Sequence, residues 1–202
     1  MRASDLRKLG VESEERSARL SAGFAESAAG RGLIDVSYGF ADSPMGRLLV
    51  AMTRRGLVRL EYPGRSLDEQ LQELARRVSP RILEWAKGTE GVRRELDEYF
   101  EGRRRRFDVP VDLSLTNGFS RRVLRAAGRI PFGTVATYRD VATQAGSPRG
   151  MRAAGNALGS NPVPIVVPCH RVLHTGGGLG GYTGGLDRKV ALLRLEGVLE
   201  AR

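Results

Sequence analysis

Hydrophobic and polar residues alternate in the first third of the chain, as they do in antiparallel strands. Residues 33–40, 47–52 and 57–62 form three such segments, separated by turn residues at 42–44 (Asp-Ser-Pro) and 55–56 (Arg-Gly). The pattern predicts a small antiparallel sheet.

Helical spacing follows the last of these segments. The sequence Ser-Leu-Asp-Glu at 66–69 is a capping box, and it opens a helix whose apolar face carries Leu67, Leu71, Leu74 and Val78. A second helix is predicted over residues 89–100. Residues 107–109 (Phe-Asp-Val) resemble one more short strand, and a linker is expected over 112–117.

The second half of the chain is predicted to be mostly helical. Thr116 or Asn117 caps a helix with apolar positions Phe119, Val123, Ala127 and Ile130. Residues 138–145 form a short helix ended by Gly-Ser-Pro at 146–148. The next helix runs to about Leu158, with Pro148 as its first residue. This is helix-turn-helix spacing. Thr175–Gly185 is a glycine-rich loop, and 187–196 is a last helix with Leu186, Val190 and Leu193 inward.

These elements predict an α+β protein with three parts. Residues 1–32 are charged, with only weak helical spacing, and are interpreted as an extension that is either a mobile tail or a loosely docked helix. Residues 33–112 form a small N-terminal α+β domain, and residues 113–202 form a mostly helical C-terminal domain. The chain of 202 residues is long enough for both domains to bury a core.

Positive charge is concentrated in the C-terminal half. The net charge is +10, and residues 117–202 contain twelve basic and four acidic side chains. Between Leu113 and Leu186 the only acidic residue is Asp140. A polyanionic partner such as nucleic acid is the natural inference, because lysine and arginine neutralise phosphates without regard to sequence. The alternative is a basic surface that only favours solubility.

Several classes of protein are excluded by composition. The sequence contains neither an apolar run long enough to span a bilayer nor a secretory signal pattern, so a cytoplasmic, nucleoid-associated location is expected. The single cysteine excludes an internal disulfide and a zinc site with several cysteines.

That cysteine lies in the segment Asn161-Pro-Val-Pro-Ile-Val-Val-Pro-Cys-His-Arg171. Its three prolines restrict the backbone and exclude a helix, and Val163 to Val167 are apolar enough to be buried. A thiol held at the end of a stiff, buried segment, with His170 next to it, is a candidate activated nucleophile. The alternative is an inert core cysteine.

The segment resembles the Pro-Cys-His-Arg motif of the O6-alkylguanine-DNA alkyltransferases (methylated-DNA–protein-cysteine methyltransferases). The resemblance extends in order and spacing over about residues 117–198. It includes Ile-Pro-Phe-Gly-Thr-Val-Ala-Thr-Tyr at 130–138, Arg-Ala-Ala-Gly-Asn-Ala at 152–157, Gly-Tyr-Thr-Gly-Gly-Leu at 181–186 and Leu-Glu-Gly at 195–197. It implies a ribonuclease H-like N-terminal domain and a C-terminal domain with a winged helix-turn-helix.

The resemblance also implies the chemistry. Cys169 accepts an alkyl group from O6 of guanine, and O4 of thymine is a second candidate substrate. His170 takes the thiol proton, directly or through a water, and Glu196 orients the imidazole. Asn161 belongs to the same network, and the Tyr138 hydroxyl lies by the guanine ring. The implied substrate pocket contains Pro164, Val167, Tyr182, Thr183, which is commonly serine in the family, and Gly184.

For DNA, the resemblance implies that the helix around residues 149–158 enters the minor groove. Arg152 takes the place of the extruded base, and the small residues Ala153, Ala154 and Gly155 allow close approach of the backbone. Thr137 and Arg171 are further candidate DNA contacts. The residues agree with this, because a reader of the major groove presents several Asn, Gln, Arg or Lys side chains, whereas small residues with one arginine suit a narrow groove and little sequence preference. The alternative is a helix-packing face.

The predicted protein is therefore a monomeric DNA-repair methyltransferase that acts on duplex DNA after flipping out the damaged nucleotide. It needs no cofactor or metal, and the cysteine and histidine ligands through which some family members bind structural zinc are missing here. Since no residue can hydrolyse the thioether product, each molecule reacts once. Three other interpretations stay open: a Cys-His hydrolase, a non-catalytic lesion-binding protein and a transcription factor.

Overall fold

The three predicted N-terminal strands are present in the computed structural model, which describes residues 20–200. They form β1 (Val36–Ala41), β2 (Leu48–Thr53) and β3 (Gly56–Glu61), and a fourth strand, β4 (Ile82–Glu84), completes the sheet in the order β3-β2-β1-β4. The β1–β2 and β2–β3 pairs are antiparallel, as predicted. Strand β4 was not predicted, because three residues are too few to show alternation, and it pairs parallel to β1.

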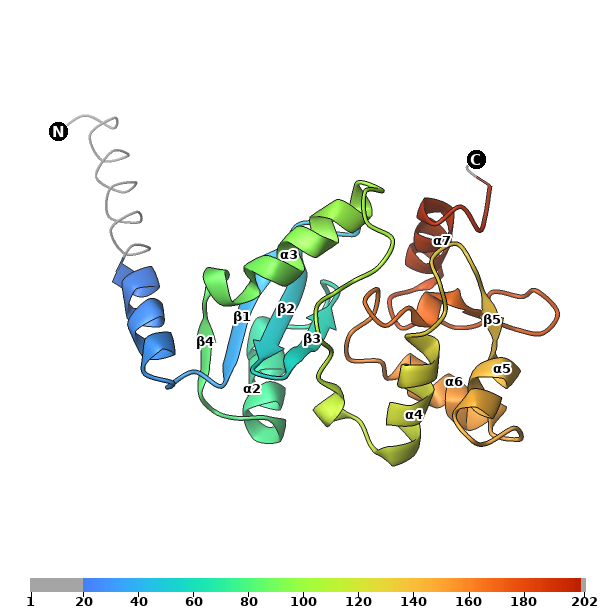
Figure 1. Ribbon diagram of the computed structural model, residues 1–202, viewed down its shortest axis with the longest axis horizontal. Helices are drawn as coiled ribbons and strands as arrows, with labels where there is room; N and C mark the ends of the chain where they lie inside the picture. Colours follow the sequence, from blue (N-terminus) through green and yellow to red (C-terminus); the bar gives the residue numbers. More distant parts are fainter. Residues whose placement is uncertain (1–19, 201–202) are drawn as a thin grey trace.

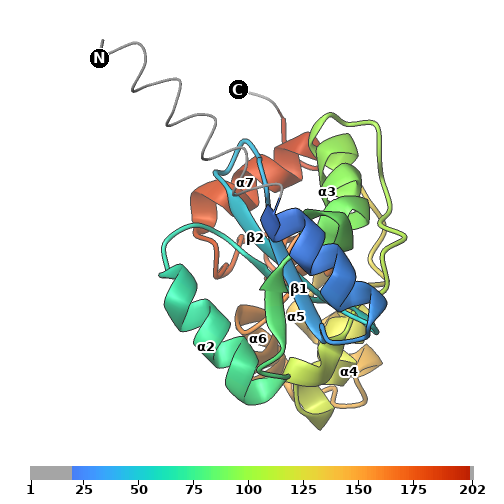
Figure 2. The ribbon, with the colours of Figure 1, turned by 90° about the vertical axis from the view of Figure 1, so that its left-hand side faces the viewer.

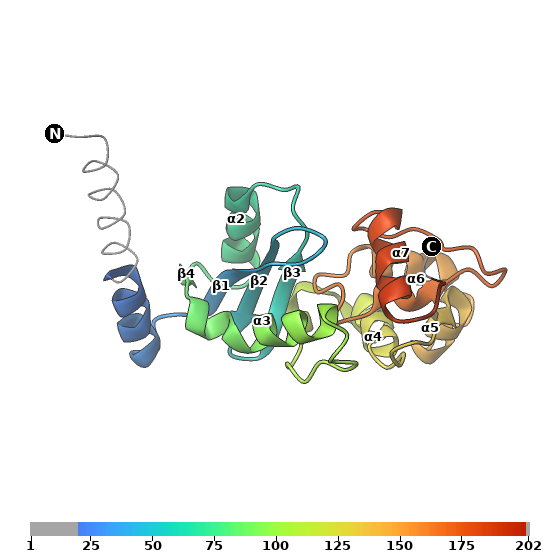
Figure 3. The ribbon, with the colours of Figure 1, turned by 90° about the horizontal axis from the view of Figure 1, so that it is seen from above.

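The two predicted helices of this half cover opposite faces of the sheet (Figure 3). They are α2 (Leu67–Arg77) and α3 (Ala86–Phe100), and Figure 2 shows them on either side of the strands. Ser66 caps α2 by accepting a hydrogen bond from the Glu69 amide at 3.2 Å. The second helix was predicted to begin at 89 but begins at Ala86. Both faces of the sheet are therefore buried.

The predicted strand at 107–109 is wrong. The amides of Asp108 and Val109 donate to the Glu95 carboxylate, at 2.8 and 3.2 Å, so they have no need of a neighbouring strand. The backbone that follows pairs with the sheet at an isolated bridge between Leu57 and Val111. A side chain of α3, 13 to 14 residues away in sequence, thus replaces the strand pairing that the apolar pattern suggested.

The C-terminal half is mostly helical, as predicted (Figure 1). Its elements are η1 (Leu113–Leu115), α4 (Gly118–Ala127), β5 (Ala136–Thr137), α5 (Tyr138–Gln144), α6 (Met151–Gly159), η2 (Cys169–Arg171), β6 (Val172–Leu173) and α7 (Leu186–Leu195). Asn117 caps α4, with its side chain accepting from the Ser120 amide at 3.2 Å. Helices α5 and α6 form the predicted helix-turn-helix, and residues 175–185 form the predicted loop.

Two details of these helices differ from prediction. Helix α6 begins at Met151 rather than at Pro148, because Pro148 lies in a turn closed by a hydrogen bond from the Gly150 amide to the Ser147 carbonyl. In α7 the buried residues are Lys189, Leu192 and Leu193, whereas Leu186 is about half exposed (51%) because it occupies the first position of the helix.

The larger of two hydrophobic clusters in the described residues spans both halves. Leu48, Leu60 and Tyr99 of the N-terminal half belong to the same buried cluster as Ile165 and Leu192 of the C-terminal half. The Leu60 amide of β3 also donates to the Pro162 carbonyl at 2.8 Å, outside the regular ladder. The edge of the sheet therefore holds the cysteine segment in place, and the two halves share an apolar interface of the kind that keeps domains together.

The described part of the N-terminal extension is helical. Residues 20–30 form a helix at the outer edge of the N-terminal half, beyond β4 (Figure 1). Ala25 and Ala28 are buried there, and Glu26 pairs with Lys87 of α3. This part agrees with a docked helix, whereas the prediction for residues 1–19 lies outside the described residues. Within residues 20–200, no helix is both long enough and apolar enough to cross a bilayer.

Candidate active site

The segment before the cysteine has a tightly specified backbone. Pro162, Pro164 and Pro168 restrict it, and Ile165 between them has φ of 71°, a conformation that is strained for a β-branched residue. The Val167 amide closes the turn by donating to the Val163 carbonyl at 2.9 Å. Strain of this kind persists only where surrounding contacts enforce it. The strained turn lies directly before η2, which begins with Cys169.

The thiol of Cys169 is buried, with 6% of the residue exposed. Asn161 Nδ2 donates to Cys169 Sγ at 3.1 Å and to the Val167 carbonyl at 2.8 Å, while Asn161 Oδ1 accepts from the Val163 amide at 3.1 Å. Burial raises the pKa of Cys169 to about 11, and the Asn161 bond opposes that rise. The thiol is therefore protonated at neutral pH, and a base must remove its proton before it can attack a carbon atom.

His170 is suited to be that base. It is fully buried, and its Nε2 lies 2.9 Å from Glu196 Oε1. A charged carboxylate accepts only, so Nε2 carries the proton and Nδ1 is the free acceptor. Nδ1 is buried and has no hydrogen-bond partner among residues 20–200. Burial lowers the pKa of His170, which keeps the imidazole neutral at physiological pH despite the nearby Glu196.

Glu196 is held ionised by its neighbours. Burial opposes its charge, but hydrogen bonds from His170 and Arg171 outweigh burial and lower the pKa of Glu196 to about 2. Arg171 donates through Nε to Oε2 and through Nη2 to Oε1, both at 2.8 Å, and through Nη1 to the Ile130 carbonyl at 2.6 Å. The predicted DNA contact of Arg171 is wrong: the residue is only 6% exposed and all its donor groups point inward.

A cavity of about 670 Å³ opens beside the thiol. It brings together residues from α5, α6, η2 and the glycine-rich loop, namely Tyr138, Met151, Arg152, Gly155, Leu158, Gly159, Cys169, His174, Gly181, Tyr182 and Thr183. Its volume is in the usual range for a small-molecule site, and a purine fits it. The predicted residues Tyr138, Tyr182 and Thr183 therefore lie around the same space as Cys169.

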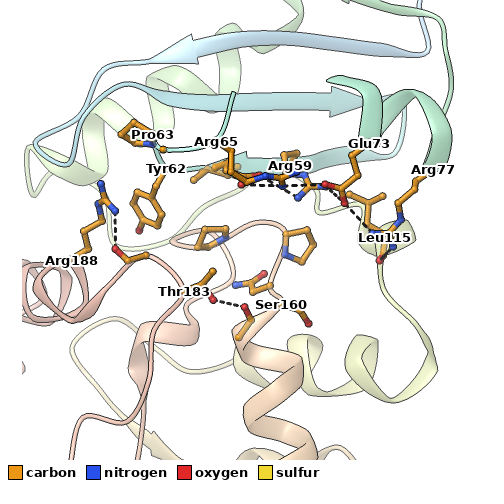
Figure 4. Close-up of a pocket in the computed structure, with 18 residues that line it drawn as sticks. Arg59, Tyr62, Pro63, Arg65, Glu73, Arg77, Leu115, Ser160, Thr183 and Arg188 are labelled. Atoms are coloured by element: carbon orange, nitrogen blue, oxygen red, sulfur yellow. Dashed lines mark hydrogen bonds and ion pairs between the residues drawn. The ribbon is translucent and has the colours of Figure 1, made fainter. Parts of the chain in front are cut away.

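The other predicted pocket residues lie elsewhere. Pro164 and Gly184 line an adjoining cavity of about 460 Å³ between the two halves, together with Arg59, Arg65 and Arg188 (Figure 4). Thr183 and Gly159 line both cavities, and the Thr183 hydroxyl donates to the Gly159 carbonyl between them.

Val167 is also placed differently from the prediction. Val167 lines a third hollow, together with Asp112 and Arg121. Its contribution to the thiol site is its carbonyl, which accepts a hydrogen bond from Asn161 Nδ2 and so helps to hold that side chain beside Cys169. The chain turns between Val163 and Val167, so residues close to the nucleophile in sequence face different cavities.

Helix α6 presents a surface of small residues at the mouth of the cavity. Arg152 and Ala153 are exposed and Gly155 is half-buried, in agreement with a surface that approaches DNA closely. Ala154 is fully buried in the core, so the prediction of a direct DNA contact is wrong for it. Thr137 caps α5: its hydroxyl and amide both engage Asp140, which completes a capping box.

Two residues of the site were missed by the sequence analysis. The His174 ring lies 5.1 Å from the Tyr138 ring and lines the cavity. Tyr99 of α3 donates to Glu196 Oε1 at 2.7 Å. Nothing in the local sequence around Tyr99 indicates this, because it reads as one apolar position of a helix face.

The chain was compared with known protein families. The family described as "6-O-methylguanine DNA methyltransferase, ribonuclease-like domain" matches residues 36–113, and "6-O-methylguanine DNA methyltransferase, DNA binding domain" matches residues 118–198. A methylated-DNA–protein-cysteine methyltransferase of Mycolicibacterium paratuberculosis is 40% identical over 164 residues, which cover 80% of this chain and 92% of the relative. An inducible protein of the same name from Bacillus subtilis is 40% identical over 149 residues, covering 73% and 82%.

Solved structures are similar over the same region. The crystal structure of Mycobacterium tuberculosis OGT in complex with DNA superposes with a TM-score of 0.69 at 37% identity, covering 79% of this chain and 92% of that one. The O6-methylguanine-DNA methyltransferase of Pyrococcus kodakaraensis has a TM-score of 0.56 at 23% identity, covering 81% and 99%, and so shares the fold. The predicted α+β fold, with its ribonuclease-like sheet domain and helical DNA-binding domain, is confirmed.

Proposed function

The chain belongs to the 6-O-methylguanine DNA methyltransferase family, whose members repair DNA by transferring an alkyl group to a cysteine, and we propose how its own residues carry out that reaction. Cys169 is the acceptor, since it is the only cysteine in the chain. The observation that carries the proposal is the cavity in which Cys169, Tyr138 and Arg152 meet, at the exposed end of α6.

The first step is loss of the thiol proton. No direct hydrogen bond joins Cys169 Sγ to the His170 ring in the part of the chain that the structure describes, so the proton crosses to Nδ1 through one water. Glu196 stabilises the imidazolium that forms, as a buried carboxylate does for other catalytic histidines. The thiolate then attacks the alkyl carbon, the C–O6 bond breaks, and its electron pair leaves with the guanine.

The departing guanine anion needs a proton at the other side of the cavity. Tyr138 lines that side and is packed against Gly180, whose position leaves no room for a side chain beside the phenol oxygen. Burial and the neighbouring Cys169 raise the pKa of Tyr138, so the phenol stays protonated at neutral pH and can donate. Asn161 positions the sulfur throughout, and the product is a thioether that nothing in the site can hydrolyse, so each molecule reacts once.

Access to the cavity requires that the damaged nucleotide leave the duplex, at a cost of a few kcal/mol. Arg152 stands at the cavity mouth on α6, where its side chain can fill the gap left by the base. Ala153 and Gly155 beside it let the helix approach closely, which suits a minor groove and gives little sequence preference.

The proposal includes the partner and the place of action. The partner is duplex DNA bearing O6-alkylguanine, and the protein binds it as a monomer. Because its substrate is DNA, the protein is expected to associate with the nucleoid. Residues 33–112 support the site and residues 113–202 contain the reacting groups, with residues 1–32 as an extension.

Transfer of radiolabel from an O6-methylguanine duplex to the protein tests the chemistry. The parent is expected to take up one methyl group per molecule, with a permanent mass increase on the peptide containing Cys169, and Cys169→Ser is expected to take up none. Sustained product formation from an unmodified cysteine would instead show a hydrolase. Duplex binding by a parent that transfers no methyl group would show a lesion-binding protein.

Arg152→Ala tests base extrusion. The variant is expected to transfer methyl more slowly from duplex DNA while keeping the parent's rate with free O6-methylguanine, because only the duplex must be opened. Arg94→Ala, an exposed arginine on α3, is the control of equal charge. An equal loss of rate on duplex DNA and on free O6-methylguanine would refute a role for Arg152 in extrusion. A strong preference for one DNA sequence in a binding selection would refute sequence-tolerant binding.

A further inference from the structure

One hydrogen bond to the catalytic network comes from the N-terminal domain. Tyr99 lies on α3, 97 residues before Glu196, and donates its hydroxyl to Glu196 Oε1 at 2.7 Å. Tyr99 is fully buried. The contact therefore crosses the core that joins the two halves and ends on the carboxylate that orients His170.

The ring of Tyr99 is held on several sides. Its centroid lies 5.2 Å from that of Phe107, 5.4 Å from that of Phe100 and 6.3 Å from that of Phe132. Phe132 belongs to the C-terminal half, so the ring is packed from both domains. The direction of the hydroxyl is thereby determined by packing, and a buried tyrosine hydroxyl needs such a partner.

The three donors on Glu196 Oε1 make this bond consequential. Tyr99, Arg171 Nη2 and His170 Nε2 lie at 2.7, 2.8 and 2.9 Å from that one oxygen. Within the described part of the chain, Oε2 accepts only from Arg171 Nε, at 2.8 Å. The oxygen that binds the imidazole is therefore the one that Tyr99 also binds. Removing the Tyr99 hydroxyl therefore changes the orientation of the Glu196 carboxylate. It also changes the negative charge on the oxygen that binds His170.

We propose that Tyr99 is a positioning residue for alkyl transfer, through which the N-terminal domain sets the orientation and the proton affinity of His170. The inference rests on the proposed role of His170 as the base that takes the Cys169 proton. The hydroxyl keeps the Glu196 carboxylate aligned with His170 Nε2, which leaves Nδ1 as the accepting nitrogen. It also withdraws negative charge from Oε1, so that the imidazole gains a second proton less readily.

The sign of the effect follows from the groups that surround the imidazole. These are Glu196 and Lys189 from the α7 region, Arg171 and Cys169 from η2, Tyr182 from the glycine-rich loop and, through Glu196, Tyr99 from α3. Removing the Tyr99 hydroxyl leaves Oε1 more negative, which stabilises the imidazolium. The pKa of His170 then rises. On acidification the variant therefore loses the neutral imidazole, which accepts the thiol proton, at a higher pH than the parent does.

Tyr99→Phe is the test, because it removes one oxygen and keeps the packed ring. Tyr38→Phe is the matched control: Tyr38 lies on β1 of the same domain and its hydroxyl is 3.5 Å from Glu84, away from the site. Single-turnover methyl transfer is measured against pH for both variants and the parent. The imidazoles are titrated by NMR after ¹⁵N-histidine labelling, which gives one set of ring signals for each of the two histidines in the chain.

Tyr99→Phe is expected to slow transfer at neutral pH by roughly tenfold, the effect of one hydrogen bond to a charged group. The acidic midpoint of the rate profile and the His170 titration are both expected to move up by about half a pH unit or more. Tyr38→Phe is expected to match the parent in both measurements.

Two results would overturn the role of Tyr99. One is a Tyr99→Phe profile that superimposes on the parent's. The other is a slower variant with an unmoved midpoint and a lower melting temperature, which would show a structural role only. Failure of the proposed function is recognised separately, as a parent that transfers no methyl group. If the His170 titration still moves on Tyr99→Phe in that case, the effect of Tyr99 on the His170 pKa stands, but its role in alkyl transfer is refuted.

Discussion

Replacing Arg171 by alanine tests whether this arginine stabilises the fold or contacts DNA. The guanidinium makes three hydrogen bonds, two to Glu196 and one to the Ile130 carbonyl, and is almost entirely enclosed. Arg171→Ala leaves the Glu196 charge buried, with only His170 and Tyr99 as remaining donors. Breaking a buried ion pair by removing one partner costs about 3–5 kcal/mol.

In a chain of this size, each kcal/mol lowers the melting temperature by about 2–4 °C, so Arg171→Ala is expected to melt roughly 6–20 °C below the parent. Circular dichroism at 222 nm during heating and during urea unfolding measures the loss. Affinity for undamaged duplex is expected to stay close to the parent's at temperatures where the variant is folded, because the side chain does not reach the surface.

Arg152→Ala is the matched control, since it removes the same charge from an exposed position, the second residue of α6, rather than from the core. It is expected to unfold within about 0.5 kcal/mol of the parent, as surface substitutions usually do. An Arg171→Ala protein that melts with the parent but binds duplex several-fold more weakly would refute the reasoning and restore Arg171 as a DNA contact.

Three further outcomes are expected. Asn161→Ala removes the bond that opposes the rise in the Cys169 pKa, so alkylation of the thiol by iodoacetamide should require a higher pH than in the parent; an unmoved profile would contradict this. Gly180→Ala should slow methyl transfer, because Gly180 has φ of 68° and a Cβ there would lie 2.6 Å from the Tyr138 hydroxyl, whereas Gly176→Ala in the same loop meets no atom within 4 Å and should not. The free energy of unfolding should fall by about 3 kcal/mol as the pH drops from 4.5 toward 2, since the Glu196 pKa is about 2 when folded and near 4.5 when unfolded; urea titrations at several pH values measure this, and an unchanged free energy would refute it.

Much of the local structure could be predicted because its causes lie close together in the chain. Ser66 and Asn117 accept hydrogen bonds from amides three residues later, so the starts of α2 and α4 follow from short stretches of sequence. Strands β1 to β3 follow from alternation and turn residues in the same way. The failures arose where a distant group intervened, as when the Glu95 carboxylate took the amides of residues 108 and 109.

The candidate site shows the same division. The sequence contains the motifs of the family in the same order and with the same spacing. These motifs identified Cys169, His170, Asn161, Glu196 and Tyr138, and the structure brings these residues together. Which residues line the cavity could not be predicted as well, because the segment turns between Val163 and Val167 and its residues face different ways. Pro164 and Val167 accordingly line other hollows.

The sequence by itself determined the reacting thiol, the stiff segment that carries it, the helix-turn-helix and the excess of positive charge, since each is a property of residues near one another in the chain. Only the tertiary structure decided that Arg152 is exposed and Arg171 enclosed, although both follow the same pattern of basic residues. It also decided that Tyr99 reaches Glu196 from 97 residues away. Burial and pairing depend on which surfaces meet in the core, and hydrophobic periodicity specifies that a face is buried without specifying its partner.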